Sequence, residues 1–298
     1  MKIEKLYPAF KDYLWGGNTL KEKYGKLTDT EPLAESWELS FHRDGLCRLE
    51  NGKTLSQTVT KEDLGSKLDK FSDFPVLIKF IDAKSDLSVQ VHPSDEFAKK
   101  YEGGLGKTEM WYVAEADKNA GIYLGFKNDV TKEEYEAAIN DGTLCSLLNF
   151  VKVKKGDCYF IPAGTIHAIG AGCLICEIQE NSNLTYRVFD YKRKDKNGNE
   201  RELHIDKALT VTNLHQFRPI SSDPPILAKC EYFTVSKLIL NDTATYRTDT
   251  ESFHSLTCIA GNGEIDGKTI SRGDTFFIPA NYGEYTLSGN AELLLCRL

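Results

Sequence analysis

Four residues at three places in the chain could together bind a metal ion. Gln90 and His92 are two positions apart in a strand-like run, so their side chains point to the same face. Glu109 occurs in a Lys-Thr-Glu-Met-Trp-Tyr run, and His167 comes just after a Pro-Ala-Gly corner. Two imidazoles, a carboxylate and an amide oxygen make a mixed nitrogen and oxygen donor set. The pattern therefore predicts a metal site formed by these four side chains.

The nearby acid Glu96 is an alternative ligand for this site. Its His-x-x-x-Glu spacing from His92 would also suit a metal ion. It falls, however, in the first turn of a helix that begins after Ser94, where helix capping and the helix dipole explain a carboxylate. Glu109 is preferred for this reason. The other four histidines are interpreted as ordinary hydrogen-bonded residues: His42, His204, His215 and His254.

The elements that must position these residues are mostly strands. Runs dense in β-branched and aromatic residues alternate with Gly, Asp, Asn and Pro, which is typical of an all-β protein. Many short strands at close spacing predict a sandwich or barrel with minor helices. Strands are expected at 74–81, 87–92 and 110–113, and helices at 94–101, 131–139, within 141–150 and at 205–210.

One segment is repeated along the chain. Lys155-Gly-Asp-Cys-Tyr-Phe-Ile-Pro-Ala163 recurs as Arg272-Gly-Asp-Thr-Phe-Phe-Ile-Pro-Ala280. Each copy combines a tight Gly-Asp turn, an apolar strand and a Pro-Ala corner, which indicates two related barrels. At the offset where the first copy has His167 the second has Glu284, and it has no counterpart of the Gln-x-His pair. We expect the second copy to lack the chemistry of the first.

The length of 298 residues suits one large all-β domain or two ordinary ones. A Pro-rich connection at 217–225 is the expected boundary. It gives a catalytic domain over 1–220, with a short helical segment at about 127–150, and a degenerate C-terminal domain over 221–298.

Composition and charge exclude several classes of protein. Hydrophobic residues make up 41% and charged residues 27%, which is typical of a folded globular chain. The net charge of −7, with scattered cations, argues against nucleic-acid binding. The sequence has neither an apolar run of membrane-helix length nor a secretory signal, so we expect a cytoplasmic protein. The eight cysteines, Cys173 and Cys176 among them, are interpreted as reduced thiols.

At this point six motifs, in chain order, resemble the short bacterial form of type I mannose-6-phosphate isomerase, in the cupin superfamily. They are Tyr13-Leu-Trp-Gly-Gly17, Pro32-Leu-Ala-Glu-Ser-Trp-Glu38, Leu87-Ser-Val-Gln-Val-His-Pro93, Lys107-Thr-Glu-Met-Trp-Tyr112, Pro162-Ala-Gly-Thr-Ile-His-Ala168 and Tyr186-Arg-Val-Phe-Asp-Tyr191. The resemblance covers most of the chain. It implies two cupin-like (jelly-roll) β-barrels, with a small helical segment between strands of the first. It also implies an isomerase of mannose metabolism that interconverts mannose 6-phosphate and fructose 6-phosphate through a zinc-stabilised enediol.

The resemblance implies a role for individual residues as well. One Zn²⁺ per chain would be bound by Gln90, His92, Glu109 and His167. With a single anionic ligand the zinc site keeps one positive charge, which can stabilise an enediolate. Lys107 and Arg187 would occupy the positions of the family's active-site lysine and arginine. Each could hold the phosphate or stabilise the oxyanion.

Some parts of this assignment stay open. The family often has an acid where this chain has Asn183, and an amide cannot shuttle a proton, so Asn183 is assigned to substrate binding. Ser88 could donate to the phosphate or merely end a strand. Lys107 is one candidate for the base that moves the proton, and a hydroxide at the metal is another.

Two other functions are compatible with the same residues. One is a cupin dioxygenase that uses Fe(II) on two histidines and a carboxylate, although Gln90 would narrow its open coordination positions. The other is a cupin that binds sugar phosphates without turnover. In every case the expected partner is a small sugar phosphate, not nucleic acid or membrane, and the chain is expected to be a monomer or a small homo-oligomer.

Overall fold

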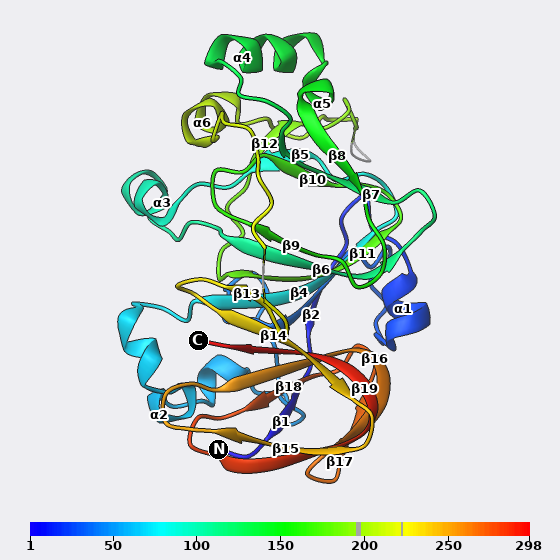
Figure 1. The fold of residues 1–298 in the computed structure, drawn as a ribbon, viewed down its shortest axis with the longest axis vertical. Helices are drawn as coiled ribbons and strands as arrows, with labels where there is room; N and C mark the ends of the chain where they lie inside the picture. Colours follow the sequence, from blue (N-terminus) through cyan, green and yellow to red (C-terminus); the bar gives the residue numbers. More distant parts are fainter. Residues whose placement is uncertain (195–197, 222) are drawn as a thin grey trace. The chain divides into compact units, whose positions relative to one another are not determined.

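The computed structural model describes residues 1–194, 198–221 and 223–298. It divides into two compact units (Figure 1). Unit 1 consists of Met1–Lys11, Asn18–Phe80 and Ser221–Leu298, and unit 2 of Asp12–Gly17 and Ile81–Ile220. The domain boundary expected between 220 and 221 stays a prediction, and residue 222 of that connection lies outside the described residues.

Unit 2 contains two groups of antiparallel strands. One sheet has the order β12 (Tyr186–Phe189), β5 (Val89–Val91), β10 (His167–Ile169), β7 (Gly121–Phe126) and β8 (Leu148–Lys152). The other group runs in the order β11 (Cys173–Glu180), β6 (Glu109–Ala116) and β9 (Cys158–Ile161). The predicted all-β class with minor helices is confirmed.

Helices of unit 2 cover the outer face of the first sheet. Figure 1 shows α4 (Lys132–Asp141), α5 (Leu144–Leu147) and α6 (Ile205–Val211) on the side of β5, β10 and β12, with α3 (Asp95–Tyr101) at its edge. Val89, Val91 and Ala168 point to this side, into a cluster with Leu144 and Leu209. Because side chains alternate along a strand, the intervening residues of β5 face the opposite side.

The predicted helices of unit 2 are confirmed, with one difference. Thr131 caps α4 in a reciprocal capping box with Glu134, and Ser94 caps α3. The helix expected within 141–150 is only the four residues of α5, because Asn149 and Phe150 belong to β8. Pairing of Phe150 with Tyr123 on β7 overrides the local helical preference there.

Unit 1 is built on a large antiparallel sheet. Its order is β1 (Glu4–Leu6), β18 (Thr275–Ile278), β16 (His254–Ile265), β19 (Gly283–Arg297), β14 (Thr234–Leu240) and β13 (Ile226–Lys229), with β15 (Thr243–Thr248) on β19 and β17 (Lys268–Ser271) on β16. Strands β2 (Ala9–Lys11), β3 (Glu35–Leu39) and β4 (Val76–Ala83) follow one another in a second sheet, and the end of β4 belongs to unit 2. The helices are short: α1 (Thr19–Tyr24), α2 (Lys61–Leu64) and 3₁₀ turns at Leu55–Gln57 and Ser66–Lys70.

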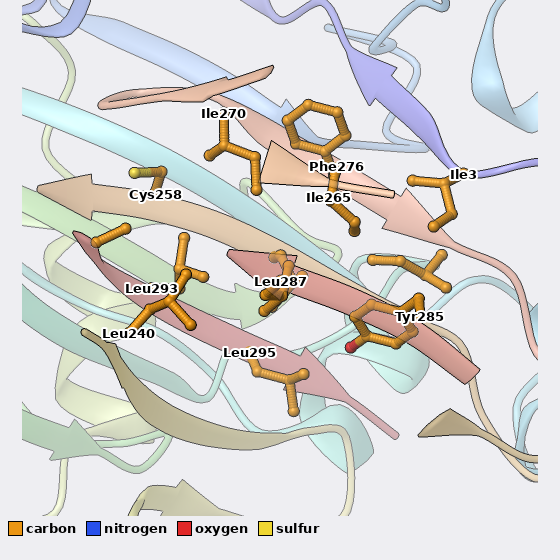
Figure 2. Packing of buried hydrophobic residues seen from close by; sticks show 13 residues of the cluster. Ile3, Leu240, Cys258, Ile265, Ile270, Phe276, Tyr285, Leu287, Leu293 and Leu295 are labelled. Atoms are coloured by element: carbon orange, nitrogen blue, oxygen red, sulfur yellow. The ribbon is translucent and has the colours of Figure 1, made fainter. Parts of the chain in front are cut away.

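The interior of the C-terminal part of unit 1 is filled with hydrocarbon side chains. Figure 2 shows Leu287, Leu293 and Tyr285 of β19 packed among side chains of neighbouring strands. The repeated segment forms the same element in both copies, since β9 and β18 occupy equivalent positions of the two sequences. The eight cysteines, all within the described ranges, are free thiols.

Candidate metal centre

Strands from the two sheets of unit 2 bring the predicted ligands together. Gln90 lies in the middle of β5, and His92 directly follows that strand. His167 begins β10 and is the cross-strand partner of Gln90. Glu109 begins β6 in the other sheet. A polar site between the sheets results, because the apolar residues that alternate with these ligands pack outward.

Glu109 lies between the two imidazoles. One carboxylate oxygen is 3.5 Å from His92 Nε2, and the other is 3.3 Å from His167 Nε2. The possible ligand atoms of the three residues all lie within 4.8 Å of one another, and all three side chains are buried. Three donor atoms this close can converge on a single ion.

Backbone carbonyls orient both histidines for ligation. Nδ1 of His92 is 2.8 Å from the carbonyl oxygen of Leu184, and Nδ1 of His167 is 2.9 Å from that of Thr165. A carbonyl oxygen only accepts, so each Nδ1 must carry the hydrogen, and each Nε2 keeps its lone pair toward Glu109. Burial, and then the charge of Lys107, lower the pKa of His167 to about 4, which keeps its imidazole neutral. This donor set fits a divalent metal ion.

The Gln90 amide completes the set. Its terminal nitrogen is 3.3 Å from His167 Nε2. Because an amide nitrogen and oxygen are distinguished only by their partners, a half-turn of this group would present the oxygen to a cation. The structure therefore brings together all four of the predicted ligands, and Glu96 is exposed in the first turn of α3.

Lys107 is buried beside this cluster. Its Nζ lies 2.8 Å from Glu109 Oε2, 3.1 Å from His92 Nε2 and 3.3 Å from Glu177 Oε1. Glu177 in turn accepts a hydrogen bond of 2.7 Å from the indole of Trp111. Sequence reasoning missed Glu177. Its signal was an acid inside the apolar run of β11, because a buried charge needs a partner.

Arg187 lies on β12 next to the cluster, opposite Gln90 in the antiparallel register. Its neighbours Tyr186 and Val188 pack toward the helices, so Arg187 is on the face of Gln90. The backbone nitrogen of Arg187 donates to His204 Nδ1, which explains one histidine outside the metal cluster. His254 is likewise explained by its contact of 2.8 Å with the hydroxyl of Tyr285.

The two predicted substrate-binding residues differ in burial. Ser88 is buried one residue before β5, close in sequence to Gln90. Asn183 is exposed in the connection between β11 and β12, and its backbone carbonyl accepts a hydrogen bond from Thr185. Within the described ranges, the helices are all too short or too polar to span a bilayer.

Comparisons with known proteins point to one family over the whole chain. Residues 3–139 match the family of the phosphomannose isomerase type I catalytic domain, and residues 226–297 match the cupin domain of mannose-6-phosphate isomerase. The chain is 37% identical to mannose-6-phosphate isomerase ManA of Bacillus subtilis, over 100% of both chains. It is 34% identical to mannose-6-phosphate isomerase of Streptococcus mutans, over 94% of this chain and 93% of the relative.

A solved structure has the same fold. The crystal structure of mannose 6-phosphate isomerase from Bacillus subtilis superposes with a TM-score of 0.89 and 34% sequence identity, over 100% of both chains. The sequence and structural comparisons thus agree on the cupin fold of this chain.

Proposed function

The chain belongs to the type I phosphomannose isomerase family, and we propose that it interconverts mannose 6-phosphate and fructose 6-phosphate. The observation that carries this proposal is the buried cluster of His92, Glu109 and His167. Aldose–ketose isomerisation moves a proton between C1 and C2, and negative charge develops on the two neighbouring oxygens. A buried site that combines a metal ion with nearby cations suits this charge.

We propose that the resident ion is one Zn²⁺ per chain, held by Gln90, His92, Glu109 and His167. Nitrogen donors from two histidines and oxygen donors from a carboxylate and an amide are ligands that zinc accepts. The ion would act as a Lewis acid toward the substrate oxygens. The Nδ1 contacts to Leu184 and Thr165 support this assignment, because they direct both Nε2 lone pairs to the same point.

We propose that Lys107 moves the proton between C1 and C2, or assists that step. Its ammonium lies beside Glu109 and His92, at the place where substrate oxygens would approach. Glu177 and Glu109 hold the nitrogen from two sides, which fixes its position. Arg187 would carry an anion-binding role at the same face, with Ser88 and Asn183 as further substrate contacts.

The setting inferred for this activity is a small-molecule one. We propose that the protein works in the cytoplasm on sugar phosphates, as a monomer or small homo-oligomer, without nucleic-acid or membrane partners. The net charge of −7 supports this proposal, since nucleic acid and anionic lipid would both be repelled.

A coupled assay tests the reaction and the metal together. Fructose 6-phosphate formed from mannose 6-phosphate is measured through a dehydrogenase, before chelation, after chelation and after zinc is added back. We expect turnover that chelation abolishes and zinc restores. No turnover with a full complement of zinc would refute the proposed substrate. Activity that survives in metal-free protein would refute the metal assignment. Colour on adding nitric oxide to the iron-loaded protein, together with oxygen consumption, would favour the dioxygenase.

A further inference from the structure

Three arginines gather around one buried carboxylate at the end of β12. Asp190 is only 5% exposed. Arg201 donates to both of its oxygens, from Nε at 2.7 Å and from Nη2 at 2.5 Å. Arg193 donates to the same carboxylate, and Arg187 is three residues before it in the strand. We call Arg187, Asp190, Arg193 and Arg201 the arginine cluster.

The charge of this cluster is not balanced from within. Three guanidinium groups share one carboxylate, and Arg187 does not use it: its Nη1 donates to the backbone carbonyl of Glu202 at 2.8 Å. Its Nε is buried, with no hydrogen-bond partner in the described part of the chain. Burial and the charge of Arg201 lower the pKa of Arg187. A buried donor without a partner, in a field of excess positive charge, favours binding of an anion.

The cluster adjoins the metal centre. Arg187 is the register partner of Gln90, one of the four proposed ligands, and shares its face of the sheet. A β-bulge follows Arg187 before the register resumes at Phe189 and Val89. An anion bound by Arg187 would therefore lie on the rim of the same site, within reach of a sugar whose other end is at the metal.

The three arginines differ in what else they contact. Arg193 donates to the backbone carbonyl of Asp86, and its guanidinium lies 5.2 Å from the ring of Tyr191. It is thus fully engaged in holding the chain together. Arg201 is anchored along one edge by Asp190, and a guanidinium has a second edge with further donors. Asp190 fixes the fork of Arg201 in a single orientation.

We propose that Arg201, oriented by Asp190, joins Arg187 in binding the phosphate group of the sugar phosphate. Two planar forks match the oxygens of a dianion better than one, and the second fork also pairs with the charge that Arg187 leaves uncompensated. Asp190 is a positioning residue in this arrangement. The inference rests on the proposed function and adds a binding residue to it.

The test compares Arg201→Gln with Arg193→Gln. Both substitutions remove one arginine from Asp190, but only the first removes a proposed phosphate ligand. Two quantities are measured on zinc-loaded protein: the KM for mannose 6-phosphate and the Kd of inorganic phosphate by calorimetry. For Arg201→Gln we expect both to rise by about 10- to 100-fold, the factor for one lost charged hydrogen-bonding partner. Arg193→Gln should raise them far less.

The outcomes separate the two proposals. Wild-type values in Arg201→Gln, or equal losses in both variants, would overturn the role of Arg201, since equal losses indicate only an effect on Asp190. If the wild-type protein binds phosphate with Arg201 but turns over no mannose 6-phosphate, the anion site stands and the proposed function fails. Arg201→Lys keeps the charge beside Asp190 and serves if the glutamine variant has a lowered Tm. It should weaken phosphate binding by a smaller factor, because a lysine lacks the fork.

Discussion

Gln90 and His167 face each other across neighbouring antiparallel strands, with 3.3 Å between the amide nitrogen and the imidazole Nε2. The pairing matters because it places a neutral group where a second carboxylate would fit. Glu109 is then the single anion among the four proposed ligands. A divalent ion bound here keeps one unit of positive charge for the substrate.

Gln90→Glu tests the value of that charge. A second carboxylate should hold the metal at least as well, but it would cancel the residual positive charge. We expect full metal content and a kcat lowered by about tenfold or more. Metal analysis of the same sample that is used for kinetics checks both parts. Wild-type kcat at full zinc occupancy would show that the neutral ligand is not needed.

His167→Ala should lose metal and activity together. The imidazole supplies one of the two nitrogen donors, and its replacement leaves Glu109 facing a gap. We expect an affinity for zinc that is about 10- to 100-fold lower, and turnover that falls in proportion to occupancy. His215→Ala is the control, because that side chain is 81% exposed and remote from these ligands. Retained zinc in His167→Ala would remove His167 from the ligand set.

Lys107→Met tests proton transfer. A methionine fills similar volume but cannot accept or donate a proton, so kcat should fall by about 100-fold or more while zinc remains bound. Lys79→Met is a matched control, since Lys79 is also a buried lysine, 3.7 Å from Glu35 in unit 1. The control should lower the free energy of unfolding and leave kcat unchanged. Near-wild-type turnover in Lys107→Met would end the case for Lys107.

His254 should make unit 1 sensitive to acid. Burial lowers the pKa of this histidine from 6.5 to about 4, so the unfolded chain binds the proton first as the pH falls. Its contribution to the free energy of unfolding is present above pH 6.5 and is lost as the pH falls toward 4. The loss amounts to about 2 kcal/mol between pH 7 and pH 5.

Urea unfolding of the wild type and of His254→Gln, at pH 7 and pH 5, measures that loss. The glutamine can still reach the hydroxyl of Tyr285 but does not titrate. We expect the difference in stability between the two pH values to be smaller in the variant. An identical pH dependence would assign the acid sensitivity to other groups.

Much of the metal cluster could be predicted from the sequence because strand periodicity is a local rule. It places Gln90 and His92 on one face without knowledge of the fold. What periodicity cannot give is the partner of a buried charge. Glu177 lies in an apolar strand, and its partner Lys107 comes from a segment far along the chain. The contact depends on which strands pair, and that is decided by the whole sheet.

The same limit applies to the larger elements. Helices α3 and α4 could be predicted because their caps are local, with Ser94 and Thr131 as the first residues of recognisable motifs. The strand at Phe150 was missed, since it exists only through pairing with Tyr123. The grouping of Asn18–Phe80 with Ser221–Leu298 in unit 1 was equally out of reach, because it joins segments that are distant in the sequence.

The repeated strands β9 and β18 have opposite consequences for how the two copies can change. Around β18, residues such as Leu256, Phe276 and Leu293 occupy the interior completely, so an imidazole introduced there would be a buried polar group with neither an ion nor water for company. Restoring a second reaction centre would first require a cavity to be carved. The second copy is therefore free to drift in chemistry but not in volume, whereas the first must keep its donors and can tolerate looser packing.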